Sequence, residues 1–202
     1  MTAEDAYDAL MVDHAAGALA PAQALLVDTH LGLKPAARAA AAALAATGGA
    51  LLESMAPVEV AALPLAALAP ALVRPPAPDR LGQVRAMVAA ARRTPDALHW
   101  RWRAPGLREV RLPLEGASLI RLAGGGALAP HGHAGEEFTL VLRGQFFDAA
   151  GMYDVGDIGF ADESVDHNPR VPPGDECVCL VAATGELKFH GVLARVTARL
   201  LA

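Results

Sequence analysis

Two histidines and a glutamate lie close together in the stretch PHGHAGEEFTLVLRG, residues 130–144. His131 and His133 are two positions apart, so in an extended segment both side chains project from the same face. Glu137 follows four residues later, at the start of an apolar strand, and can turn back to join them. Imidazoles and a carboxylate suit a borderline divalent ion such as zinc, nickel, iron or manganese. The stretch therefore predicts a metal site.

A fourth ligand has to come from another part of the chain, and His167 in ADESVDHNP is the candidate. We predict that His131, His133, Glu137 and His167 bind one divalent ion, with zinc preferred. Glu136 would point to the opposite face of a strand from Glu137, which predicts a bystander. The alternative is that the same residues line a pocket that holds no metal.

The segments that must position these residues have a period of two after Asp96. Short apolar runs alternate with Gly, Pro and Asp, and no helical pattern separates them. Even spacing of this kind is typical of a β-sandwich or barrel. The predicted strands are HWRWRA, LREVRLPL, ASLIRLA, FTLVLRGQFF, DIGFAD, CVCLVAA, ELKFHGVL and VTARLLA.

The first half of the chain is helical by pattern instead. Residues 3–17, 21–32 and 35–55 predict a small all-α bundle, with Gly48-Gly49 weakening the third helix. Six of the 15 prolines lie within residues 57–80, which leaves one short helix at 65–73 and the linker RPPAPDR. An amphipathic helix follows at 81–93. We predict a helical domain (1–73), a linker with a connecting helix (74–96) and a β domain (97–202).

Charge and composition exclude several classes of protein. The net charge of −5 falls entirely in the second half of the chain, and no basic patch that would follow a phosphate backbone is present. The N-terminus lacks the pattern of a signal peptide. Prolines and glycines interrupt the alanine-rich stretches, so we expect no membrane span. These features predict a cytoplasmic protein without direct nucleic-acid binding.

The two cysteines, Cys177 and Cys179, are separated by one residue in a predicted strand. Their side chains would share one face, at a distance poorly suited to a disulfide. We expect buried thiols in a reducing compartment.

The spacing around the histidines resembles a known motif. Gly125, His131-x-His133, Glu137 and Gly144 match the first cupin motif, and Gly156-Asp157 precedes His167 by the spacing of the second. Together with the helical N-terminal region and the proline-rich linker, the chain resembles the ChrR family of cupin-containing anti-sigma factors. The resemblance implies a C-terminal cupin barrel or jelly roll that senses reactive oxygen species. It also implies an N-terminal domain that binds an extracytoplasmic-function (ECF) sigma factor.

The N-terminal half departs from that family's zinc-binding pattern. In zinc anti-sigma domains, the histidine of the second helix is followed by C-x-x-C. Here His30 is followed by Lys34 and Ala37 at the two thiolate positions, and no histidine lies early in the first helix. An ammonium and a methyl group do not ligate zinc, so we expect no N-terminal zinc. The bundle either binds sigma by apolar packing alone or has lost that function.

Three functions remain open at this point. The first is an anti-sigma factor, a transcriptional regulator of a stress response whose helices 3–55, with 81–93, clasp an ECF sigma factor. The alternative is a metal-dependent cupin enzyme of the dioxygenase or isomerase type with a helical appendage. In the third, the metal is structural and both halves serve contacts of a homodimer.

Overall fold

The computed structural model describes residues 2–58, 79–128, 131–165, 167–185 and 187–189. Three helices form the N-terminal part: α1 (Ala3–Ala16), α2 (Pro21–Leu33) and α3 (Pro35–Ser54). A further helix, α5 (Arg80–Arg93), and the short 3-10 helix η1 (Pro95–Ala97) precede the strands. The expected helix at 65–73 and the last expected strand, VTARLLA, lie outside the described residues.

The helix ends follow from local sequence. Thr2 and Asp5 form a reciprocal capping box at the start of α1, and Gly17 ends the helix in a left-handed conformation with φ of 69°. Helices α2 and α3 both begin with a proline, which lacks only an N–H that would have no helical partner. Asp79 caps α5 by accepting a hydrogen bond from the backbone N–H of Gly82.

Ten strands follow. A six-stranded antiparallel sheet has the order β1-β2-β3-β9-β5-β8, and the pairs β10–β4 and β6–β7 lie beside it. Each predicted strand segment up to residue 189 contains at least one observed strand. The bounds are β1 (Arg101–Ala104), β2 (Leu107–Arg111), β3 (Ala117–Leu122), β4 (His131–His133), β5 (Glu137–Arg143), β6 (Phe146–Phe147), β7 (Met152–Tyr153), β8 (Ile158–Ala161), β9 (Cys177–Ala183) and β10 (Leu187–Phe189).

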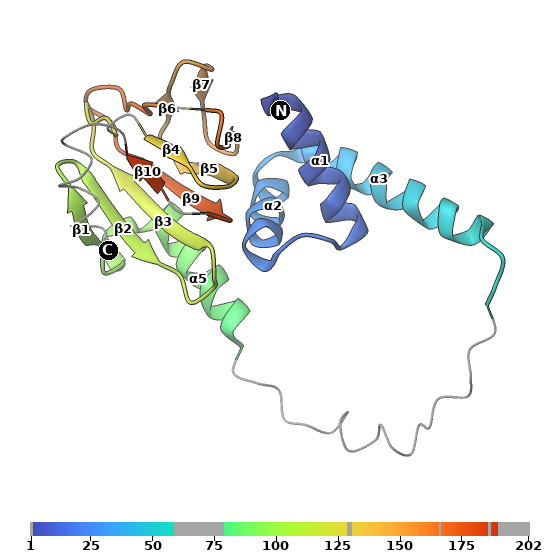
Figure 1. Cartoon of the computed structure of the whole chain (residues 1–202). Coiled ribbons are helices and arrows are strands. Elements are labelled where there is room, and N and C mark those ends of the chain that lie inside the picture. Colours follow the sequence, from blue (N-terminus) through green and yellow to red (C-terminus); the bar gives the residue numbers. More distant parts are fainter. Residues whose placement is uncertain (1, 59–78, 129–130, 166, 186, 190–202) are drawn as a thin grey trace.

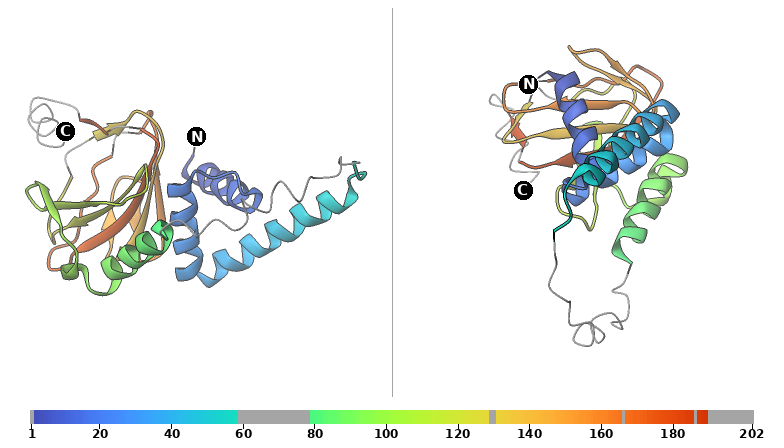
Figure 2. Two further views of the ribbon diagram at one scale, coloured as in Figure 1. Left: turned by 90° about the horizontal axis from the view of Figure 1, so that it is seen from below. Right: turned by 90° about the vertical axis from the view of Figure 1, so that its right-hand side faces the viewer.

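The central strands β5 and β9 are covered on both faces, which explains why they are continuous apolar runs. Leu140, Leu142 and Leu180 face the helices and belong to one core with residues of α1, α2 and α5. Val141 and Cys179, at alternating positions, belong to a second core inside the barrel. The helices therefore pack on one outer face of the sheet, as Figures 1 and 2 show, and the cupin interior lies behind it.

Helix α5 packs against β5 and β9. Its apolar side chains Val84, Val88 and Ala91 are buried in the core that the helices share with the sheet. The amphipathic pattern of residues 81–93 therefore reflects packing on the cupin, and the polar face of the helix remains for other contacts.

Helix α3 extends away from the rest of the molecule (Figures 1 and 2). It runs through Gly48-Gly49 without a break, which confirms the helix predicted over 35–55. The expectation that the two glycines divide the apolar stretch is wrong. Among the described residues, α3 is the only individual helix that is long and apolar enough to cross a membrane. Helices α1 and α2 reach that length only if they are taken together, and they are bent by 100° relative to each other. Helices of soluble proteins and signal sequences share these properties, and α3 owes its apolar character mainly to alanine.

Candidate metal centre

The strands bring His131, Glu137 and His167 together at one end of the cupin interior. Strand β4 carries His131, and β5 begins at Glu137. His167 lies beyond β8 and pairs with His131 through two backbone hydrogen bonds, with N···O distances of 3.2 and 3.1 Å. This isolated antiparallel bridge places two sequence-distant histidines opposite each other.

The side-chain geometry suits a metal ion. One donor atom from each of the three side chains lies within 4.8 Å of the others, and the Nε2 atoms of His131 and His167 are 3.0 Å apart. Two imidazole nitrogens bound to tetrahedral zinc are separated by roughly 3.3 Å, given Zn–N bonds of about 2.0–2.1 Å. The donor set and its spacing therefore fit a divalent ion of the zinc type.

Burial gives the carboxyl of Glu137 unusual chemistry. It raises the pKa of Glu137 to about 7, and the hydrogen bond from Thr139 Oγ1, at 3.2 Å, lowers the pKa in part. A carboxylate in such a place is stabilised by a nearby cation. Thr139 is two residues beyond Glu137 and thus on the same face of β5, so strand alternation could have identified it.

Asp148 is a residue of the site that sequence reasoning missed. Its Oδ2 lies 3.7 Å from Nδ1 of His167, on the ring edge opposite the Nε2 that faces His131. This separation is longer than a hydrogen bond, so the carboxylate acts on the His167 ring through its negative charge, which would favour a cation bound at Nε2. No spacing rule points to Asp148, because the turn between β6 and β7 brings it there.

The cavity between these residues has a volume of about 20 Å³ among the described residues. This volume is sufficient for an ion or a single water molecule. Cys179 is part of its lining. As expected, Cys177 and Cys179 are buried free thiols; their sulfurs are 3.5 Å apart, too far for a covalent bond.

The four predicted ligands are described to different extents. The structure brings His131, Glu137 and His167 together. His133 lies on β4, but its side chain is outside what the structure describes, so its part in the site stays a prediction. Glu136 is half-buried next to β5, and its backbone N–H donates to Thr184 Oγ1 at 3.0 Å.

A second histidine lies at the contact between the helices and the cupin. His30 of α2 is only 5% exposed. Its Nδ1 is 2.7 Å from the carbonyl oxygen of Gly156, and its Nε2 is 2.9 Å from the hydroxyl of Tyr7. Lys34 pairs with Asp157 at 2.9 Å. Residues of the helices and of the turn before β8 thus meet around His30, and we call Tyr7, His30, Lys34, Gly156 and Asp157 the His30 cluster.

Gly156 is adapted to this contact. Its φ of +91° favours glycine, and a Cβ atom there would lie 2.7 Å from Cε of Lys34 and 3.2 Å from Cβ of Leu33. Burial lowers the pKa of His30, which the Gly156 carbonyl raises in part. His30 is thereby neutral at physiological pH and joins α2 to the turn before β8.

Comparison with known proteins gives a consistent assignment. The ChrR cupin-like domain family matches residues 90–187. The anti-sigma-E factor ChrR of Cereibacter sphaeroides is 40% identical over 199 residues, which cover 94% of this chain and 93% of that protein. The crystal structure of Rhodobacter sphaeroides SigE in complex with the anti-sigma ChrR matches with a TM-score of 0.69 and 41% identity, over 87% of this chain and 96% of that one. An RmlC-like cupin protein from Ralstonia eutropha follows at 18% identity and a TM-score of 0.41, over 48% of this chain and 69% of that one. The similarity extends along nearly the whole chain and includes both the helical bundle and the cupin. This chain therefore belongs to the ChrR family of cupin-containing anti-sigma factors.

Proposed function

We propose that this chain is a cytoplasmic anti-sigma factor whose helices bind an ECF sigma factor and whose cupin regulates that binding. The cytoplasm is the compartment in which a sigma factor works. The similar ChrR protein of known structure is in complex with SigE, and the similarity covers the helices as well as the cupin.

The observation that carries the proposal is the uncovered end of α3. Leu51, Leu52 and Met55 are 64–69% exposed, and Val58 beyond the helix is 85% exposed. Contiguous exposed apolar side chains mark a surface that a partner covers. Only Ala37 and Ala41 of α3 are buried, so most of the surface of this helix is exposed to a partner.

We also propose that the cupin binds one divalent ion, zinc by preference, through His131, His133, Glu137 and His167. The geometry of His131, Glu137 and His167 supports this set. The ion would cross-link β4, β5 and the segment after β8 and would neutralise the buried carboxylate of Glu137. The 20 Å³ cavity favours such a regulatory or structural role over turnover of an organic substrate.

Copurification of the full chain with the ECF sigma factors of its source organism tests the anti-sigma function. We expect one sigma factor to be retained at micromolar concentration and its transcription to be inhibited in vitro. If none is retained and transcription is unaffected, the proposal is wrong.

The matched variants L51E/M55E and W102E/M152E test where the sigma factor binds. Each replaces two exposed apolar residues with glutamate, on α3 or on the cupin strands. We expect the α3 variant to lose the complex and the cupin variant to keep it, with both proteins folded by circular dichroism. The opposite pattern would place the interface elsewhere.

A further inference from the structure

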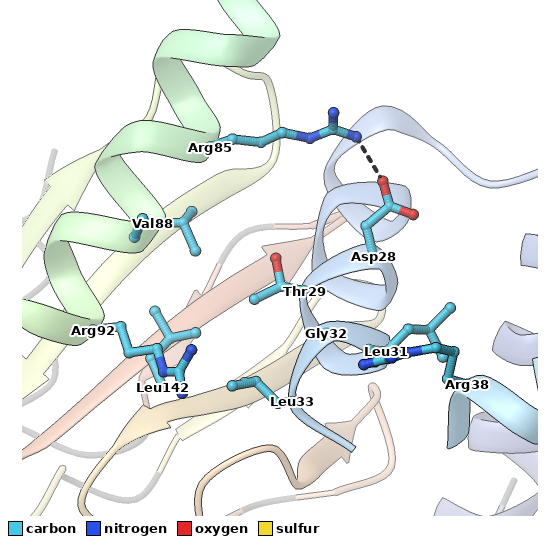
Figure 3. Close-up of a pocket in the computed structure, with 11 residues that line it drawn as sticks. Asp28, Thr29, Leu31, Gly32, Leu33, Arg38, Arg85, Val88, Arg92 and Leu142 are labelled. Atoms are coloured by element: carbon cyan, nitrogen blue, oxygen red, sulfur yellow. Dashed lines mark hydrogen bonds and ion pairs between the residues drawn. The ribbon is translucent and has the colours of Figure 1, made fainter. Parts of the chain in front are cut away.

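A groove lies where the helical bundle meets the cupin, on the side of α2 that faces α5. Its volume is about 610 Å³, and α2, α5, the start of α3 and strand β5 line it (Figure 3). Leu31, Leu33, Val88 and Leu142 supply its apolar wall. It is separate from the metal centre, which lies inside the cupin.

Three arginines surround this groove. Arg85 and Arg92 are seven residues apart on α5, so they lie on one face of that helix. Arg85 reaches across to Asp28 of α2 at 2.9 Å (Figure 3). Arg38 donates through Nε to the carbonyl oxygen of Leu31 at 3.1 Å. Among the described residues, none forms a hydrogen bond or ion pair with Arg92.

The charges of the groove leave an excess of positive charge. Asp28 is the single carboxylate among the described residues that line it, and His14 and Arg85 both contact Asp28. The chain as a whole carries a net charge of −5, so this cationic groove contrasts with the rest of the molecule. Apolar walls with cationic edges complement a segment that carries both apolar side chains and carboxylates.

We propose that this groove receives an acidic, amphipathic segment of the sigma factor; this inference rests on the proposed function. The segment would contact α2 and α3 on one side and α5 and β5 on the other. Its affinity would therefore depend on how the bundle sits on the cupin. A change in the cupin would reach the sigma factor through this contact and not only through α3.

Other occupants fit the groove less well. The phosphate backbone of a nucleic acid would gain nothing from the four aliphatic side chains of the apolar wall. A small anion would leave the same four side chains in contact with water. Residues 59–78 of the chain itself contain one carboxylate, Glu59, and one arginine, Arg74, so their charges cancel. They lack the charge that the three arginines would complement.

The test compares the wild-type chain, R38E/R92E and R101E/R108E in binding to the sigma factor identified by copurification. Arg101 and Arg108 are exposed residues of β1 and β2, so the control has the same change in net charge away from the groove. We expect R38E/R92E to bind at least about tenfold more weakly, because like charges then face the partner. The control should stay within about twofold, and added salt should weaken the wild type more than R38E/R92E.

Each other outcome has a definite meaning. If R38E/R92E binds the sigma factor as tightly as the wild type, the proposed role of the groove is wrong and the anti-sigma function still stands. If the wild type does not bind at all, both the groove proposal and the anti-sigma function are wrong. Tighter binding of the sigma factor by R38E/R92E would mean that residues 59–78 compete for the groove. If the wild type binds double-stranded DNA and R38E/R92E does not, the groove is a nucleic-acid site. Either outcome overturns the inference. If loss of the Arg38 bond prevents folding, R92E alone carries the test with an expected threefold to tenfold loss.

Discussion

Two histidine-centred clusters in this protein have opposite chemistry. At the candidate metal centre, donor atoms of His131, Glu137 and His167 converge within 4.8 Å. In the His30 cluster, the carbonyl oxygen of Gly156 accepts a hydrogen bond, so Nδ1 of His30 carries the proton and Nε2 accepts from Tyr7. A histidine whose two nitrogens are both used in this way joins structural elements and is not available to a metal.

Neighbouring charge distinguishes the clusters further. The metal centre contains a buried carboxylate, which a cation stabilises. The His30 cluster contains the ammonium of Lys34, which repels a cation and pairs with Asp157 of the cupin. His30 and Lys34 thus attach the helices to the cupin.

The largest expected difference between the two clusters is in the metal content of their variants. Elemental analysis of the purified chain should find a single divalent ion, which H167Q or E137Q removes because a ligand is lost. H30Q should retain the full amount. Chelation should lower the melting temperature of the wild type and of H30Q alike. Two ions per chain, or loss of the ion in H30Q, would contradict the assignment of the two clusters.

The next largest effect concerns the glycine at the contact. Gly156 and Gly174 both have φ of +91°, but a Cβ at Gly174 meets no atom within 4 Å. Alanine at Gly174 should cost about 1 kcal/mol of unfolding free energy through backbone strain alone. G156A should cost about 2–3 kcal/mol, because Lys34 and Leu33 must also move. Urea denaturation measures both.

The double variant G156A/K34A provides the control for this prediction. Removing the Lys34 side chain relieves the closest contact, so the double variant should recover part of the difference between G156A and G174A. Equal costs for G156A and G174A would mean that the helices do not press on this turn.

A smaller effect is expected at Tyr7. Y7F removes the hydroxyl that donates to Nε2 of His30 and leaves a buried nitrogen without its partner. The free energy of unfolding should fall by about 1–2 kcal/mol. In the H30Q background the same substitution should cost less, because the interaction is already gone. Additive costs in this double-mutant cycle would argue against a Tyr7–His30 interaction.

The difference between the clusters was only partly predictable from sequence. Strand alternation and short spacing point to His131 and Glu137, whereas His167 was found by the spacing of the second cupin motif, because the bridge that joins it to His131 spans 36 residues. Lys34 and Ala37, which stand at the two thiolate positions, predict a bundle without zinc, and this stays a prediction. The contact between His30 and Gly156 spans 126 residues, and packing of α2 on the sheet determines it. Likewise, the sequence showed that α5 has an apolar face, but it did not show that strands β5 and β9 cover that face.

The pH dependence of stability provides the finest test of the comparison. Burial lowers the pKa of folded His30 below its ordinary value near 6.5; Lys34 lowers it further, and the Gly156 carbonyl and Asp157 raise it in part. The unfolded chain therefore takes up a proton at His30 at a higher pH than the folded chain. The His30 contribution to stability is complete above about pH 6.5 and decreases as the pH falls below it, by at most about 1.4 kcal/mol per pH unit. Subtracting the pH profile of H30Q from that of the wild type isolates this contribution, since Glu137 titrates in both proteins. A difference profile that is flat between pH 5 and 7 would mean that His30 is not held in its neutral form at the contact between the bundle and the cupin.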